Sequence, residues 1–133
     1  MKTFKLDNWL PTTKKEVEAR GWDYLDVILF SGDAYVDHPS FGTAIISRLL
    51  EAEGYKVGVL AQPRYTDCED FKRFGKPKYG FFIGGGNVDS MVSHYSVAKI
   101  PRAEDEYSPG GKGGARPDRS ATVYTRLAKQ AYP

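Results

Sequence analysis

The chain contains a strand, a helix and a second strand in quick succession, and this pattern constrains its fold more than any other feature. The apolar run 25–30 (Leu-Asp-Val-Ile-Leu-Phe) is rich in strand-forming residues and stops at the breaker pair Ser31-Gly32. A second run, 56–60 (Lys-Val-Gly-Val-Leu), has the same character. Because continuous apolar runs are typical of strands covered on both faces, they predict a parallel sheet.

A helix is predicted between the two runs. Pro39 and Ser40 suit its first turn, because proline loses no needed donor there and serine can cap the helix. Gly54 predicts a left-handed stop, with Tyr55 placed to contact Leu50 in a Schellman-type end. Two strands joined by a helix within ~35 residues form a right-handed βαβ unit. The apolar residues that give this helix its inward stripe are Phe41, Ile45, Ile46, Leu49 and Leu50.

Further elements follow the βαβ unit. A short helix is predicted over 67–74, and a third strand over 78–83 runs into Gly84-Gly85-Gly86-Asn87. A last helix follows, and either Asp118 or Ser120 can cap it. The sequence therefore predicts an α/β fold: a small, doubly wound, mainly parallel sheet of three or four strands with flanking helices.

The length of 133 residues fits one domain. We divide it into an N-terminal arm (1–24), an α/β core (25–98), a Gly/Pro-rich loop (99–119) and a C-terminal helix (120–133). The loop contains three prolines and four glycines among charged residues. A structureless stretch of this length is typical of a functional, partner-bound or disordered segment.

Charge and cysteine usage exclude several classes of protein. The net charge is +2 and both signs are mixed along the chain, which disfavours nucleic-acid binding. Cys68 is the single cysteine, so an intrachain disulfide cannot form. No window approaches the ~20 apolar residues of a membrane span. We expect a soluble, cytoplasmic protein with no membrane or nucleic-acid partner.

Ligands of open α/β sheets collect at the carboxyl ends of the strands, where helix N-termini and loop amides converge. The loops 31–39 and 84–90 are expected there. The residues in them that we predict to contact a ligand or partner are Ser31, Gly32, Asp33, Tyr35, Asp37, His38, Gly84, Gly85, Gly86, Asn87, Asp89 and Ser90.

Plainer interpretations of both loops stay open. The glycine-rich stretch matches neither GxGxxG nor a P-loop, and a tight turn would also explain it. Asp37 and His38 lack metal-ligand spacing, because the other histidine, His94, lies on a different segment. A polar structural loop would explain them equally. We predict no catalytic and no metal-binding residue in this chain.

Five segments carry a family resemblance: 10–13 (Leu-Pro-Thr-Thr), 26–42, 84–92, 105–111 and 116–119. In this order they resemble the N-terminal region of YgiQ-type radical SAM (S-adenosylmethionine) proteins, from Leu10 to the C-terminus. Arg116, Asp118 and Arg119, in the last segment, complete the predicted contacts.

The resemblance implies a protein several times longer than this chain. Its downstream barrel would carry a CxxxCxxC motif, a [4Fe-4S] cluster and SAM. Because Cys68 cannot supply three thiolates, the resemblance transfers no catalytic residue and no cofactor to this chain. We therefore expect a non-catalytic N-terminal module whose partner is the downstream barrel of the same polypeptide; the full-length protein would be the enzyme.

The N-terminal region of such proteins is also similar to cobalamin-binding domains, which implies a flavodoxin-like or cobalamin-binding-like sheet. The axial-histidine motif Asp-x-His-x-x-Gly is not matched, since Asp37 and His38 are adjacent and Gly42 lies four residues past the histidine. Ser47-Arg48-Leu49 imitates a Ser-x-Leu element, but Gly84-Gly85 follows it too late. Cobalamin binding through a histidine is unsupported.

Two other functions remain as alternatives. The first is a stand-alone flavodoxin-like binding module for a nucleotide, flavin or corrinoid. The second is a hydrolase using Asp33, Asp37 and His38, which shows no nucleophile–base pattern. An α/β pattern would place another strand after Pro133, so we also expect a sheet cut short, with an exposed edge that favours self-association.

Overall fold

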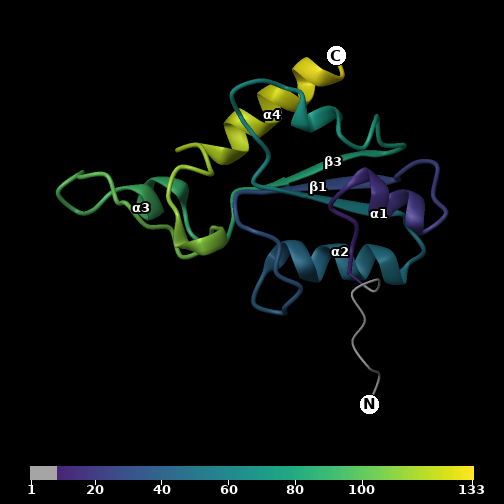
Figure 1. Cartoon of the computed structure of the whole chain (residues 1–133), viewed down its shortest axis with the longest axis horizontal. Helices are drawn as coiled ribbons and strands as arrows, with labels where there is room; N and C mark the ends of the chain where they lie inside the picture. Colours follow the sequence, from purple (N-terminus) through teal and green to yellow (C-terminus); the bar gives the residue numbers. More distant parts are fainter. Residues whose placement is uncertain (1–8) are drawn as a thin grey trace.

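A computed structural model describes residues 9–133 and contains a parallel three-stranded sheet (Figure 1). The strands β1 (Val27–Ser31), β2 (Val57–Ala61) and β3 (Gly80–Gly84) lie in the order β2-β1-β3. The predicted α/β fold is confirmed, and each strand begins one or two residues later than its apolar run. The predicted N-terminal arm, 1–24, falls partly outside the described residues.

The central strand is β1. Its residue Val27 lies opposite Val57 on one side and Gly80 on the other, and the register continues to Ser31. All five of its residues are buried. The continuous apolar run that predicts a doubly covered strand thus corresponds to the middle of the sheet.

One face of the sheet is covered by helix α2 (Gly42–Ala52), which runs below the strands in Figure 1. Its end confirms the predicted Schellman motif: Gly54 has a φ of 92°, and the amide of Tyr55 donates to the carbonyl of Leu50 at 3.1 Å. The buried apolar side chains on this side of the sheet are Leu10, Val27, Leu29, Val57 and Val59.

The start of α2 differs from the prediction. The helix begins at Gly42, and its N-cap residue, Phe41, provides no side-chain cap. The amide of Ser40 instead donates to Nδ1 of His38 at 3.1 Å, and its carbonyl accepts from the Asn87 side chain at 3.1 Å. Because these contacts hold Ser40 in a turn, the helix starts after it.

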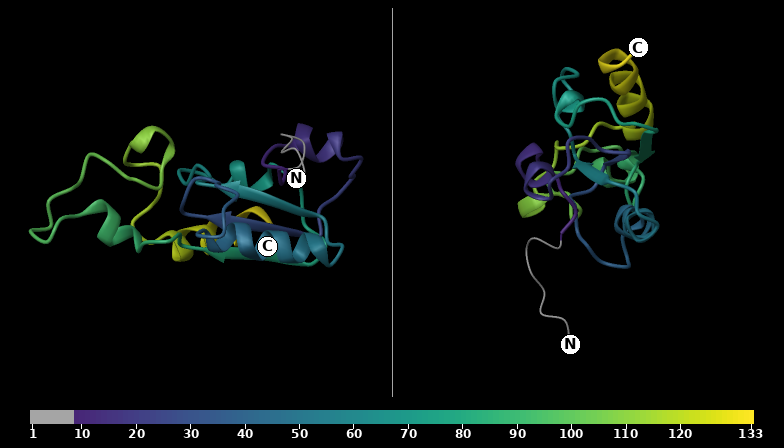
Figure 2. Two further views of the ribbon diagram at one scale, coloured as in Figure 1. Left: turned by 90° about the horizontal axis from the view of Figure 1, so that it is seen from below. Right: turned by 90° about the vertical axis from the view of Figure 1, so that its right-hand side faces the viewer.

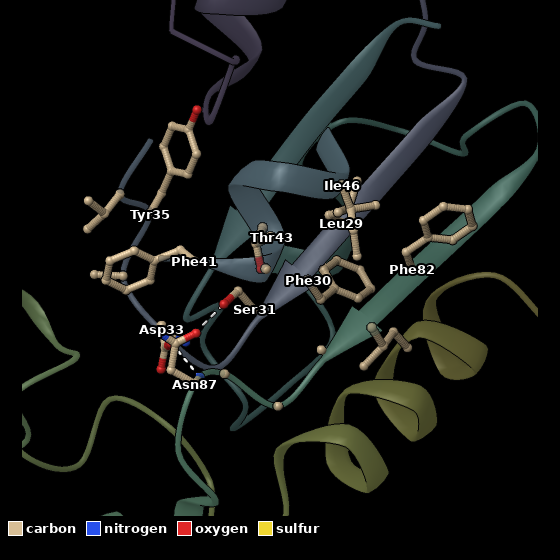
Figure 3. A pocket seen from close by; sticks show the side chains of 17 residues that line it. Leu29, Phe30, Ser31, Asp33, Tyr35, Phe41, Thr43, Ile46, Phe82 and Asn87 are labelled. Carbon is tan, nitrogen blue, oxygen red and sulfur yellow. Dashed lines mark hydrogen bonds between the residues drawn. The ribbon is translucent and has the colours of Figure 1, made fainter. Parts of the chain in front are cut away.

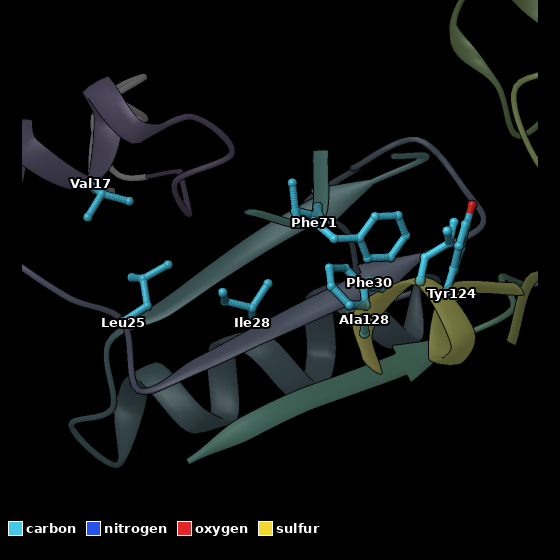
Figure 4. Packing of buried hydrophobic residues seen from close by; sticks show 9 residues of the cluster. Val17, Leu25, Ile28, Phe30, Phe71, Tyr124 and Ala128 are labelled. Atoms are coloured by element: carbon cyan, nitrogen blue, oxygen red, sulfur yellow. The ribbon is translucent and has the colours of Figure 1, made fainter. Parts of the chain in front are cut away.

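The opposite face is covered by helix α4 (Ser120–Ala131) and by the single 3₁₀ turn η2 (Asp70–Lys72). Figure 4 shows Phe30 of β1, Phe71 of η2 and Tyr124 of α4 packed together. The ring centroids of Phe30 and Phe71 are 4.8 Å apart. The two apolar layers thus enclose the sheet from both sides, as in a doubly wound domain.

The start of α4 also corrects the sequence analysis. The N-cap residue is Arg119, and neither Asp118 nor Ser120 caps the helix. The carboxylate of Asp118 contacts Nδ1 of His94 at 2.6 Å and accepts from the Tyr95 hydroxyl at 2.9 Å. These tertiary contacts occupy the side chain that would otherwise cap α4.

Several short elements were not predicted: α1 (Lys14–Ala19), α3 (Ser90–His94) and the 3₁₀ turn η3 (Pro109–Gly111). The predicted helix 67–74 is present only as η2. Figure 2 shows that α3 and the segment after it project beyond one end of the sheet. Among the described residues, no helix is long and apolar enough to cross a membrane.

Candidate functional site

The strands β1 and β3 end side by side at a topological switch point. From β1 the chain crosses through α2 to β2 on one side, whereas β3 lies on the other side. This is the position where open α/β sheets bind ligands. The loops 31–39 and 84–90 both leave the sheet here, and the amide of Gly32 donates to the carbonyl of Gly84 at 3.2 Å.

Two glycines permit this close approach of the loops. A Cβ atom on Gly32 would lie less than 3.0 Å from the carbonyl oxygen of Gly85, and backbone cannot easily move away. A Cβ on Gly86 would lie equally close to the carboxylate of Asp33. Gly86 also has a φ of 108°, which side chains rarely permit. The glycines therefore make room for loop contact and for a buried acid.

Asp33 joins the two loops. Its side chain is buried, with 2% of the residue exposed. One carboxylate oxygen accepts from the amide of Asn87 at 2.7 Å, and the amide of Asp33 donates to the Ser31 hydroxyl at 3.0 Å (Figure 3). The other carboxylate oxygen lies 3.1 Å from the guanidinium of Arg116. A residue far along the chain is thereby held at the strand ends.

Arg116 is fully buried and pairs with a second acid, Asp105. Its Nε and Nη2 atoms donate to the two carboxylate oxygens of Asp105, each at 2.7 Å. Nη1 faces Asp33. Such bidentate, charge-assisted pairs are among the strongest hydrogen bonds in proteins. One arginine therefore connects the Gly/Pro-rich segment to the end of β1.

Ser108 and Gln62 extend these contacts to β2. The hydroxyl of Ser108 donates to Asp105 at 3.0 Å. The side-chain amide of Gln62 donates to the Ser108 hydroxyl at 2.6 Å and to the carbonyl of Gly32 at 3.0 Å. The resulting set, which we call the Arg116 network, consists of Asp33, Gln62, Asp105, Ser108 and Arg116.

The two acids of the network have opposite pKa shifts. Burial raises the pKa of Asp33, and the Asn87 amide and Arg116 offset it only in part. Burial acts on Asp105 in the same direction, but hydrogen bonds from Arg116, the Tyr107 amide and Ser108 outweigh it and hold the pKa of Asp105 below its ordinary value. Asp105 is therefore the principal counter-ion of Arg116.

These shifts predict opposite effects of pH on stability. Because the pKa of Asp105 is lowered in the folded state, its ionised carboxylate stabilises the fold at pH values above the unfolded pKa of ~3.9. This stabilisation is lost on acidification. Because the pKa of Asp33 is raised, its ionisation disfavours folding as the pH rises above ~3.9. Urea unfolding from pH 2.5 to 7 should show the stability gap between wild type and Asp105→Asn growing with pH. The stability difference between wild type and Asp33→Asn should shrink over the same range. If both variants follow the wild-type dependence of stability on pH, the two acids do not have opposite pKa shifts.

A pocket of about 200 Å³ opens beside the network, between β1, β3 and the start of α2 (Figure 3). Burial raises the pKa of Tyr35 on its wall, so its phenol stays neutral to a higher pH than that of an exposed tyrosine. The ring of Tyr35 packs edge-on against Trp9, with centroids 5.8 Å apart. The large apolar and aromatic residues of the lining are Leu29, Phe30, Tyr35, Val36, Phe41, Ile46, Phe82 and Ile83.

The predicted contact residues separate into two groups. Those gathered at the ends of β1 and β3 are Ser31, Gly32, Asp33, Gly84, Gly85, Gly86, Asn87 and Arg116. The second group lies around the first: Tyr35 lines the adjoining pocket, whereas Asp89, Ser90, Asp118 and Arg119 line a second hollow together with Gly85 and Gly86. Asp37 and His38 contact Arg48 and Ser40. Asp89 also caps α3.

Sequence reasoning missed the structural role of Asp105, Ser108 and Gln62. Asp105 lies in the segment that resembles the family, but nothing in its neighbourhood indicates burial. The available signal was the pair Asp105 and Arg116, an acid and a base that bracket a stretch rich in glycine. Gln62 could have been noticed because it directly follows a buried strand, at the edge where ligands gather.

The fold and the site define a doubly wound α/β domain in which the polar residues at the switch point bind one another. Comparison with known proteins shows to which family this domain belongs. A family model described as "Radical SAM N-terminal" matches residues 9–133. The chain belongs to this family.

Curated relatives are similar to this chain over most of its length. A UPF0313 protein of Bacteroides thetaiotaomicron is 55% identical over 134 residues, which is 100% of this chain and 22% of the relative. UPF0313 proteins of Clostridium botulinum strain 657 and Methanosarcina mazei are 56% and 57% identical, over 94% and 90% of this chain and 20% and 19% of theirs. The chain thus spans about a fifth of the length of these relatives and is an N-terminal module of such proteins. No solved structure matches it significantly.

The residues of this chain do not fit an iron–sulfur cluster. A radical SAM cluster requires three thiolates, and Cys68, which is half-buried, is the single cysteine. Within residues 9–133, no group of three or more His, Cys, Asp or Glu side chains is arranged to hold a metal ion.

Proposed function

We propose that this chain is the non-catalytic N-terminal module of a radical SAM protein whose barrel, with its [4Fe-4S] cluster and SAM, lies further along the polypeptide. The family membership and the greater length of the relatives support this proposal. The chain's own role would be binding or docking in a cytoplasmic enzyme.

The observation that carries this proposal is that the charged side chains at the switch point are buried and pair with one another. Asp33 and Arg116, the charged groups best placed to act on a ligand, are 2% and 0% exposed, and Arg116 pairs with both Asp33 and Asp105. A general base or an anion receptor needs a group that can reach its substrate. These residues are used instead to fix the loops in position.

The alternative, a stand-alone module for a nucleotide, flavin or corrinoid, is favoured by the position of the pocket at the switch point. The size of this pocket argues against the alternative, because it holds about 200 Å³, whereas sites for drug-sized ligands commonly occupy ~300–1,000 Å³. A second hollow, of about 570 Å³, is lined by Gly85, Gly86, Ser90 and Arg119 and is the place where a ligand of that size would have to bind.

Reconstitution tests the proposal. The 133-residue chain and the full-length protein would each be incubated anaerobically with iron and sulfide, and sulfur-to-iron charge-transfer absorbance recorded. We expect a cluster on the full-length protein alone, with the same content in its Cys68→Ser variant because Cys68 is not a ligand. A cluster on the short chain, or none on the full-length protein, would overturn the proposal.

Titration of the chain with flavin mononucleotide, ATP or cobalamin should leave the fluorescence of Trp9, which contacts Tyr35 at the pocket wall, unchanged.

A further inference from the structure

The two outer strands of the sheet differ in how well they are covered. Four of the five residues of β2 are buried, and its amide at Val59 is bound by the carbonyl of Pro11 at 2.9 Å. None of the five residues of β3 is buried, and β3 pairs with β1 alone among the described strands. An open, partly apolar edge of this kind is a template for another strand.

An apolar patch adjoins this edge on the α2 side of the sheet. Phe82 of β3 is 47% exposed, whereas Leu29, its partner in register on β1, is buried. On α2, Ile46 and Leu49 are 46% and 62% exposed. We call these three exposed residues, Ile46, Leu49 and Phe82, the β3 patch. Apolar side chains next to an unpaired strand edge indicate a surface that is covered in the complete protein.

The side of the sheet on which α4 lies determines where a following strand would go. The connection from β2 past β1 to β3 contains η2, on the same face as α4. Because strand crossovers are right-handed in nearly all cases, two connections on one face advance in the same direction. A strand that follows α4 must therefore lie beyond β3, not beyond β2.

The end of α4 is already close to the start of β3. The ring of Tyr132, just after α4, stacks on Phe81 at a centroid distance of 6.0 Å. A chain that continues from Tyr132 would start its next strand at the amino end of β3 and would run parallel to it. The curated relatives, about five times longer, have sequence to supply that strand.

We propose that the polypeptide following Pro133 in the full-length protein adds a fourth parallel strand to β3 and covers the β3 patch. This inference rests on the proposed function, since it requires that the chain be part of a longer protein. It identifies the segment that binds to the open edge of β3 and to the β3 patch. The added strand would turn the order β2-β1-β3 into an open sheet with β1 and β3 in its interior. Strand spacing of ~4.8 Å would bring its side chains against Phe82.

Site-specific photocrosslinking in the full-length protein tests the inference. p-Benzoylphenylalanine at position 82 replaces one aromatic ring by a larger one, and the same residue at Val97, which is fully exposed, is the matched control. From position 82 we expect a crosslink within one molecule, to about the first dozen residues after Pro133, since connections of 2–6 residues and strands of 5–6 are usual. Position 97 should not give this product. A crosslink to a second copy, to another region or to nothing overturns the inference.

Hydrogen exchange gives a second readout without any substitution. In the full-length protein, amides of the peptide 79–84 should exchange as slowly as those of β1, because both edges of β3 are then paired. Fast exchange of the outward amides would overturn the inference. Cluster absorbance of the same sample separates the two proposals: a cluster with an unprotected β3 removes the docking inference alone, and an absent cluster removes the proposed function. Self-association of the 133-residue chain through this edge stays a prediction.

Discussion

Replacing Arg116 with alanine is expected to lower the free energy of unfolding by about 3–5 kcal/mol, because the substitution leaves buried acids without their partner. Asp105 is 2% exposed and would lose both charge-assisted hydrogen bonds from the guanidinium. Asp33 would lose its ion pair. Urea denaturation at pH 7, followed by circular dichroism, measures the change.

Two variants isolate the cause. Arg119→Ala removes an exposed arginine three residues away and should change stability by less than ~0.5 kcal/mol. Arg116→Lys keeps the charge but cannot form the bidentate pair with Asp105. Its loss in free energy of unfolding should therefore lie between those of Arg116→Ala and Arg119→Ala. If Arg116→Ala costs no more than Arg119→Ala, the Arg116 network does not stabilise the fold.

The contrast between this network and the strands shows what the sequence could reveal. Strand β1 and the end of α2 were predictable, because apolar runs and Gly54 are local signals that report on burial and on backbone conformation. The pair of Asp33 and Arg116 has no local signal, since the two residues meet only after the whole sheet has assembled.

The predicted N-terminal caps of α2 and α4 were wrong for a related reason. Asp118 and Ser40 have the side chains of good helix caps, but each is held in another position by a tertiary contact. Asp118 contacts His94, and the carbonyl of Ser40 accepts from Asn87 in the loop 84–90. Local propensity predicts a cap only where nothing else competes for the side chain or for its backbone. Both residues lie beside the loop 84–90 that follows β3: Ser40 contacts Asn87, and Asp118 lines a hollow with Gly85 and Gly86. The site is thus the region where sequence reasoning is weakest, although its position on the sheet was predictable.

Gly32→Ala is expected to destabilise the chain by about 3 kcal/mol or more, because overpacking against rigid backbone has no cheap relief. The added Cβ would overlap the carbonyl of Gly85 and would also approach the Ser120 hydroxyl. Moving the loop away would break the hydrogen bond between Gly32 and Gly84 and the contact of Gln62 with the Gly32 carbonyl. The loss should therefore appear as a lower urea midpoint.

Gly42→Ala is the matched control for this substitution. Gly42 is the first residue of α2, has open space around its Cβ position and does not have a positive φ. Alanine there should stabilise the chain by roughly 0.4–1 kcal/mol, because it restricts the unfolded state without straining the helix. Opposite signs for the two glycines would show that close approach of the loops, and not glycine content, makes Gly32 necessary. A Gly32→Ala chain as stable as wild type would mean that the two loops do not touch.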